Sequence, residues 1–183
     1  FTGRVNTLIR KHWNEIFVTD VNEEMIARYE NSFILDLSSA CNDVSKFTNR
    51  FDLCVSLGHQ VSFSCNIDNS FKLVNNLLKE NAYFLLDIWN SNCHEKFDPS
   101  YELQKSNACE IIRRAKLNGF KLESFSMGQK LFYLFPRLFI ILEKLLGNIF
   151  TENIVKIEKR MLSVKRDIPV QNLYFLFQKV KNV

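Results

Sequence analysis

The stretch FKLVNNLLKENAYFLLDIW, residues 71–89, decides the fold class, because an amphipathic helix here leads directly into an apolar strand. Over residues 69–80 the apolar side chains recur at the spacing of one helix face. Residues 82–88 are then almost continuously apolar. A strand of this composition is buried on both faces, which favours a parallel sheet covered by helices.

Short β-rich runs alternate with helical patterns on both sides of this stretch. Strands are expected at residues 15–19, 33–35, 51–57, 82–88, 121–126 and 173–179. Helices are expected at residues 5–12, 21–30, 69–80, 102–118, 129–147 and 151–163. Asn22 is the expected N-cap of the second helix, and Gly119 the expected C-cap of the fourth. The alternation predicts a layered α/β domain over residues 1–183, with right-handed crossovers and a helical insertion at residues 129–165.

Composition excludes a disordered tail, because 46% of the residues are hydrophobic and only 24% are charged. The net charge is +4, and all of the positive excess lies after residue 128, where 10 basic residues stand against 4 acidic ones. Two explanations of this basic region remain open. It is a solvated helical surface, or it meets phosphate, acidic lipid or nucleic acid. No recognisable nucleic-acid-binding module accompanies it, so a nucleic-acid partner is not expected.

The five cysteines are odd in number and lack CxxC spacing, which indicates reduced thiols and a cytoplasmic protein. Cys54 lies in an apolar run and is expected in the core. His94 stands beside Cys93, but no further ligand shows a partnered spacing, so no metal site is expected.

Polar residues at the ends of the expected strands are the candidate functional residues, because open α/β sheets bind ligands at the carboxyl ends of their strands. They are Asp20, Asp36, the turn at residues 56–59, and residues 87–90. A carboxylate ending the second strand of such a fold accepts two hydrogen bonds from a ribose. The alternative, that Asp20 only caps a helix or lies in a solvated turn, remains open.

Seven segments in order resemble the motifs of class I S-adenosylmethionine-dependent methyltransferases of the small-molecule, type 11-like kind. They are TGR (2–4), FVTDVNEEMI (17–26), FILDLSS (33–39), FDLCVSLGHQVSF (51–63), FKLVNNLLKENAYFLLDIW (71–89), IIRRAKLNGFKLESFS (111–126) and LYFLFQK (173–179). The resemblance implies a Rossmann-like three-layer sandwich with a mostly parallel sheet and an antiparallel C-terminal strand. It also implies S-adenosyl-L-methionine as cofactor and an enzyme that methylates a small molecule, with lipid-linked or sugar-linked acceptors as candidates.

By this resemblance eight residues contact the cofactor: Gly3, Asp20, Val21, Asp36, Leu37, Ser56, Leu57 and Gly58. Asp20 would bind the ribose, Val21 would pack on the adenine, and Asp36 would bind the adenine amine. Gly3 would approach the cofactor, and residues 56–58 would line its methionine end.

The chain departs from the family's pattern in two places. The family's first strand and the first glycines of its Gly-rich loop have no counterpart after Phe1, so an N-terminally truncated domain lacking a central strand is expected. Residues 79–81, Lys-Glu-Asn, replace the family's Pro-Gly-Gly turn. Asn tolerates the left-handed conformation, so this change is expected to be mild.

His59 follows the fourth strand at its ligand-facing end and is the candidate general base, with a pocket-lining role as the alternative. Residues 129–147 are too apolar for a one-face stripe. A lid or core helix, a homodimer contact and a peripheral membrane contact remain open for them. Two other functions also remain open. One is a non-catalytic methyltransferase-like module that acts through its apolar, basic C-terminal helices, and the other is a nicotinamide-dependent oxidoreductase.

Overall fold

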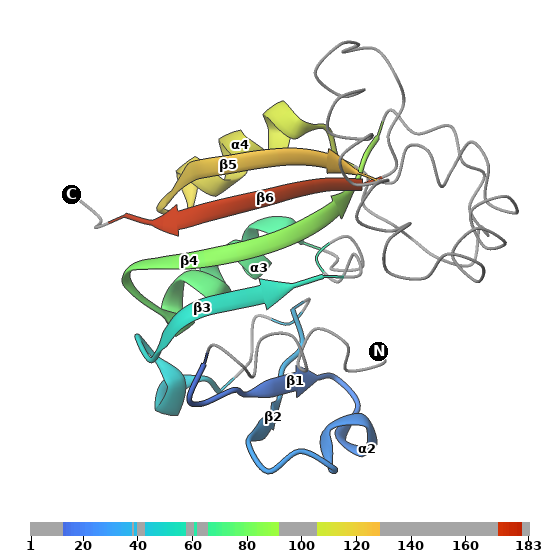
Figure 1. The fold of residues 1–183 in the computed structure, drawn as a ribbon, viewed down its shortest axis with the longest axis vertical. Helices are drawn as coiled ribbons and strands as arrows, with labels where there is room; N and C mark the ends of the chain where they lie inside the picture. Colours follow the sequence, from blue (N-terminus) through green and yellow to red (C-terminus); the bar gives the residue numbers. More distant parts are fainter. Residues whose placement is uncertain are drawn as a thin grey trace, which may run out of the picture.

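The larger sheet has the strand order β3-β4-β6-β5 in the computed structural model, which describes residues 13–37, 39, 43–57, 61, 66–91, 106–128 and 172–180. Its strands are β3 (Phe51–Ser56), β4 (Leu78–Trp89), β5 (Phe120–Gly128) and β6 (Asn172–Lys179). β3 and β4 are parallel, whereas β6 is antiparallel to both β4 and β5. The sheet therefore has the expected α/β character, with an antiparallel strand at the C-terminal end of the chain (Figure 1).

A second, smaller sheet pairs β1 (Val18–Asp20) with β2 (Ser32–Ile34) in parallel. The connection between them contains a single turn of α-helix, α2 (Glu23–Ile26). Asn22 caps this turn, as the sequence predicts. Among the described residues no ladder joins β1 to β3, so the sheet expected as one unit consists of two. The break lies between the second and third of the six strands along the chain.

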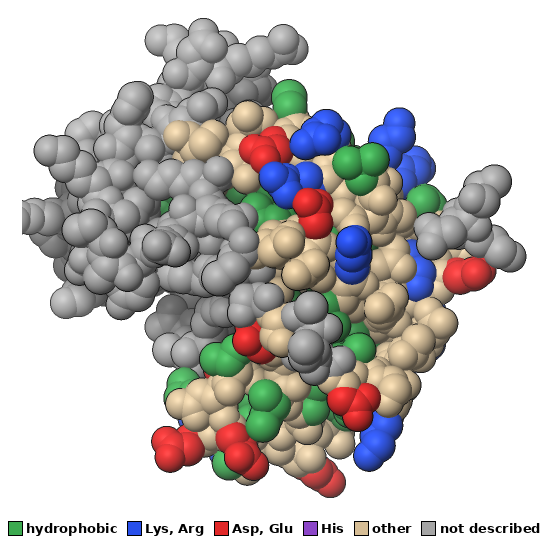
Figure 2. Space-filling view, turned by 180° about the vertical axis from the view of Figure 1, so that it is seen from behind, with side chains coloured by type: hydrophobic (Ala, Val, Ile, Leu, Met, Phe, Trp, Pro, Cys, Tyr) green, Lys and Arg blue, Asp and Glu red, His purple; other side chains and the backbone are tan. Residues whose placement is uncertain are grey.

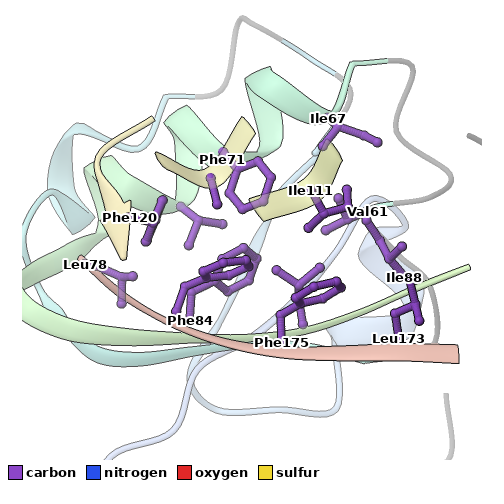
Figure 3. Packing of buried hydrophobic residues seen from close by; sticks show 14 of the residues in the cluster. Val61, Ile67, Phe71, Leu78, Phe84, Ile88, Ile111, Phe120, Leu173 and Phe175 are labelled. Carbon is purple, nitrogen blue, oxygen red and sulfur yellow. The ribbon is translucent and has the colours of Figure 1, made fainter. Parts of the chain in front are cut away.

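Two helices cover one face of the larger sheet, and the core lies between them and the strands (Figures 1 and 3). They are α3 (Ile67–Leu77) and α4 (Ala108–Leu117). Figure 3 shows Phe71 of α3 and Ile111 of α4 directed towards Phe84 and Phe175 of the sheet. Since alternate residues of a strand point to opposite faces, every second residue of β4 and β6 enters this core. These core residues are Phe84, Leu86, Ile88, Leu173, Phe175 and Phe177.

The smaller sheet is held against the larger one through α3. A second cluster joins Leu35 and Val44 to Leu73 and Leu77 of α3. Leu37 and Cys54 pack against both this cluster and the main core. Four aromatic rings extend the contact, with centroid separations between 4.1 and 6.4 Å. They belong to Phe17, Phe33, Phe47 and Phe51.

Several predicted boundaries differ from the structure, and hydrogen bonds explain two of these differences. The helix expected at residues 69–80 begins at Ile67, where Asn66 caps it, and ends at Leu77, so residues 78–80 already belong to β4. The helix expected from residue 102 begins at Ala108, because the backbone of Ser106 bonds to Trp89 instead. Asn81 does adopt the left-handed conformation, with φ of 62°.

The outer face of α3 and α4 is charged and solvated. Figure 2 shows Lys and Arg side chains with Asp and Glu side chains among them over the helices, and further Asp and Glu side chains at the opposite end, near α2. Arg114 of α4 forms ion pairs with Asp68 at 2.6 Å and with Glu110 at 2.9 Å. Within the described residues, none of the helices is both long and apolar enough to cross a membrane. The helices expected at residues 5–12, 129–147 and 151–163, and the insertion at 129–165, lie outside the described residues.

Candidate functional site

The carboxyl ends of β1, β3, β4 and β5 lie along one edge of the molecule, where β6 begins (Figure 1). We refer to this as the carboxyl edge. Asp20 ends β1, Ser56 ends β3 and Trp89 ends β4. The topology therefore brings the predicted strand-end residues of the described chain to the same edge, as expected for an α/β ligand site.

Asp20 is oriented by the turn that follows β1. Its Oδ1 accepts a hydrogen bond from the backbone N–H of Asn22 at 3.0 Å, and Asn22 Oδ1 accepts one from the N–H of Glu24 at 2.9 Å. Asn22, not Asp20, is thus the helix cap. Within the described part of the chain, Asp20 Oδ2 receives no hydrogen bond, so it can accept one from a ligand. Beside it Val21 is 63% exposed, an apolar surface next to a fixed carboxylate.

The segment after β2 is tied to Asp20 and to α3. The N–H of Leu35 donates to the carbonyl oxygen of Asp20 at 3.1 Å. The buried Ser70 hydroxyl of α3 donates to the carbonyl oxygen of Leu37, also at 3.1 Å. Asp36 lies between these two anchors and is partly exposed. These hydrogen bonds therefore hold Asp20, Asp36 and Leu37 together. We call the surface that these residues form the ledge.

Ser56 presents a polar group at the end of β3. Its Oγ is buried and has no hydrogen-bond partner in the described part of the chain, while Leu57 beyond it is half-buried. An unpaired buried hydroxyl is unfavourable unless a ligand or water satisfies it. Asp20, Val21 and Ser56 thus offer a carboxylate, an apolar surface and a hydroxyl at the carboxyl edge.

A second group of polar residues at the carboxyl edge was only half predicted. We call Asp87, Asn90, Ser106 and Asn172 the polar corner; each is at most 7% exposed. The sequence predicts Asp87 and Asn90 as strand-end residues. It does not indicate Ser106 or Asn172, because Ser106 lies in an expected helix and Asn172 precedes an apolar strand. An asparagine directly before the run LYFLF is the signal that could have indicated a strand-end site.

Three predicted site residues lie outside the described residues: Gly3, Gly58 and His59. Cys54, expected in the core, packs against both apolar clusters. Burial raises the pKa of the Cys54 thiol to about 12, which favours the protonated thiol. In the described part of the chain, no group of three His, Cys, Asp or Glu side chains could hold a metal ion.

A hollow of about 300 Å³ lies at the other ends of the strands, between the segment before β1 and the starts of β3 and β4. Two exposed ion pairs line it, Arg50 with Glu15 at 3.1 Å and Lys79 with Asp52 at 2.9 Å. The Arg50 guanidinium also covers the ring of Phe17 at 4.7 Å. Because its cations are already paired, and because it lies away from the carboxyl edge, we do not assign a ligand to it.

The fold resembles that of solved S-adenosylmethionine-dependent methyltransferases. The enzyme from Mesorhizobium loti has a TM-score of 0.64 and 12% identity, over 97% of this chain and 86% of that one. Phosphoethanolamine N-methyltransferase 2 from Haemonchus contortus, solved with S-adenosyl-L-methionine, has a TM-score of 0.63 and 16% identity, over 98% of this chain and 46% of that one. At these identities the comparison establishes the fold.

The same fold also occurs in an enzyme with another activity. The [4+2]-cyclase SpnF has a TM-score of 0.64 and 11% identity, over 99% of this chain and 73% of that one. No protein-family model matches the sequence, and no curated protein matches it. Function therefore has to be argued from the site itself.

Proposed function

We propose that the chain is an enzyme that transfers a methyl group from S-adenosyl-L-methionine to a small-molecule acceptor. The observation that carries the proposal is the ledge at the carboxyl edge, where Asp20 is fixed by Asn22 with one carboxylate oxygen left to accept. Exposed Val21 beside it and the buried Ser56 hydroxyl complete a surface of the required chemistry. The methyltransferase fold supports the same conclusion.

The residues of the ledge and those at the end of β3 would have distinct binding roles. Asp20 Oδ2 would accept from the ribose hydroxyls, because a carboxylate is the strongest neutral-pH acceptor available there. Val21 would cover one face of the adenine, and Asp36 would accept from its amino group. Ser56 and Leu57 would line the methionine end, together with Gly58.

The cofactor supplies an electrophilic methyl group on a sulfonium. The protein's contribution would be to hold this group in line with the acceptor and to exclude water. Proximity and orientation of this kind lower the activation barrier of the transfer. We place Gly3 against the cofactor, and His59 as the base that removes a proton from the acceptor. Residues 129–165 would cover the acceptor as a lid.

Methyl transfer from radiolabelled S-adenosyl-L-methionine tests the proposal. The purified chain is incubated with a low-molecular-weight cell extract that includes lipid-linked and sugar-linked fractions, and label is followed into small molecules. We expect label to enter a small molecule, and Asp20→Ala to abolish the incorporation. Cofactor binding without any transfer would contradict the enzyme assignment and favour a non-catalytic module or a non-transferring reaction on this fold.

A further inference from the structure

Buried polar side chains are concentrated at one place in the described chain. Five polar or charged residues are buried among the described residues, and four of them form the polar corner. The fifth, Ser70, is accounted for by its hydrogen bond to Leu37. Burial of a polar group is unfavourable unless it finds a partner, and among the described residues the amide oxygen of Asn172 is the atom of this corner that lacks one.

The backbone assembles this corner from distant segments. Asn172, the first residue of β6, lies opposite Trp89 at the end of β4 and opposite Gly128 at the end of β5. Ser106 is held there because its N–H donates to the Trp89 carbonyl at 3.3 Å and its carbonyl accepts from Ser91 at 3.2 Å. Asp87 comes one residue beyond Leu86, which lies opposite Ser56. The corner therefore adjoins the end of β3.

Asp87 and Asn172 point to the same face of the sheet. Leu86 and Ile88 enter the core under α3 and α4, so Asp87 and Trp89 point to the opposite face. Tyr174 and Asn172 are their cross-strand partners and share that face. Diagonal pairs of this kind lie within reach of one ligand, at about 7–8 Å between Cα atoms.

The amide of Asn172 has a hydrogen bond on one side only. Its Nδ2 donates to the hydroxyl oxygen of Tyr174 at 3.3 Å. Its Oδ1 is buried and has no hydrogen-bond partner among the described residues, and the residue is only 2% exposed. A buried carbonyl oxygen of this kind needs a donor, and the nearby carboxylate of Asp87 favours a donor that can carry positive charge.

We propose that the polar corner binds the methyl acceptor through an amino group, whose N–H donates to Asn172 Oδ1 beside Asp87. This rests on the proposed function, because it names the acceptor class of the same site. Asn172 would be a specificity-determining residue, since a carboxylate or a group without N–H or O–H cannot satisfy it. The aromatic side chains of Trp89 and Tyr174 on the same face suit an acceptor with a small ring.

Binding of three matched probes tests the proposal: benzylamine, benzyl alcohol and benzoate. Their binding to the purified chain is measured by saturation-transfer NMR, with and without S-adenosylhomocysteine. We expect benzylamine to bind most strongly and benzoate least. Asn172→Leu, which keeps the volume, should weaken benzylamine by about tenfold, whereas Asn172→Asp should not. Asn75→Leu on α3, away from the carboxyl edge, is the matched control and should leave probe binding unchanged.

The outcomes separate the two proposals. Absence of S-adenosylhomocysteine binding, measured by calorimetry on the same samples, overturns the proposed function. Probe binding measured without S-adenosylhomocysteine still tests the polar corner in that case. Benzoate binding as strongly as benzylamine, no probe binding at all, or equal benzylamine binding by Asn172→Leu overturns the amine site. In that case a buried water satisfies Oδ1.

Discussion

The hydroxyl of Ser70 donates to the carbonyl oxygen of Leu37 at 3.1 Å, joining helix α3 to the segment after β2 across 33 residues of sequence. Ser70 is completely buried. Since Leu37 also packs against both apolar clusters, this bond holds the ledge of the smaller sheet on the helix that precedes β4. The candidate site therefore depends on α3, although α3 places no side chain in it.

Ser70→Ala should lower the free energy of unfolding by about 1 kcal/mol, because a buried hydrogen bond is lost. Urea denaturation measures the change. Ser45→Ala is the matched control, since Ser45 is exposed and its hydroxyl donates to the neighbouring Asp43 at 2.7 Å. An equal effect of both substitutions would contradict the anchoring role of Ser70.

Lys179→Met should lower the free energy of unfolding by about 2 kcal/mol, because charged hydrogen bonds to buried carbonyls are lost. Lys179 Nζ donates to the carbonyl oxygens of Asn75 at 2.7 Å and Leu78 at 2.8 Å, at the C-terminal end of α3. Thermal denaturation reports the loss. Lys121→Met is the control, because the ion pair of Lys121 with Glu123 is exposed. A destabilisation no larger than that of the control would show that the lysine does not cap α3.

Replacement of Asn81 by alanine should destabilise the fold, whereas replacement by glycine should not. Its φ of 62° lies in the left-handed region, where a Cβ costs about 1 kcal/mol or more unless the side chain is Asn or Asp. We therefore expect Asn81→Ala to lower the melting temperature and Asn81→Gly to leave it nearly unchanged. Equal melting temperatures for the two variants would show that β4 does not pass through this conformation.

Cys54 should resist alkylation while Cys109 reacts. Burial raises the pKa of Cys54 to about 12, and Cys109 is exposed. Mass spectrometry after brief iodoacetamide treatment of the folded chain at pH 8 compares the two peptides, and the same treatment in urea is the control. Labelling of Cys54 at the rate of Cys109 in the folded chain would contradict its place in the core.

The same thiol predicts a pH dependence of stability. Its pKa rises from 9.0 in the unfolded chain to about 12 in the folded one, so the folded state holds its proton more tightly. The stabilisation is complete below pH 9 and is lost as the pH rises towards 12. The free energy of unfolding of Cys54→Ala should therefore fall less steeply above pH 9 than that of the unsubstituted chain, whereas Cys109→Ala should match it.

Local sequence predicted the elements whose signals are local. Asn22 caps α2 because its side chain reaches the N–H of Glu24, two residues ahead. Ser106 could not be placed in this way. The sequence from residue 102 has a helical pattern, but the backbone of Ser106 pairs with that of Trp89, and no local pattern indicates this contact.

The candidate site divides in the same way. Asp20 was predictable, since a carboxylate directly after a strand is a local signal. Asn172 was not, because its burial depends on Trp89 and Gly128, which the sheet brings opposite it from two distant strands. The polar corner is therefore a property of the topology.

Calorimetric titration of the purified chain with S-adenosylhomocysteine tests the central claim, that the ledge at Asp20 binds the cofactor. We predict one binding site per chain, and a loss of about tenfold or more in affinity for Asp20→Asn, because hydrogen bonds to a carboxylate are lost. Asp52→Asn, at the opposite edge beside Lys79, should bind as the unsubstituted chain does. No binding by the unsubstituted chain, or equal affinity of Asp20→Asn, would contradict the claim.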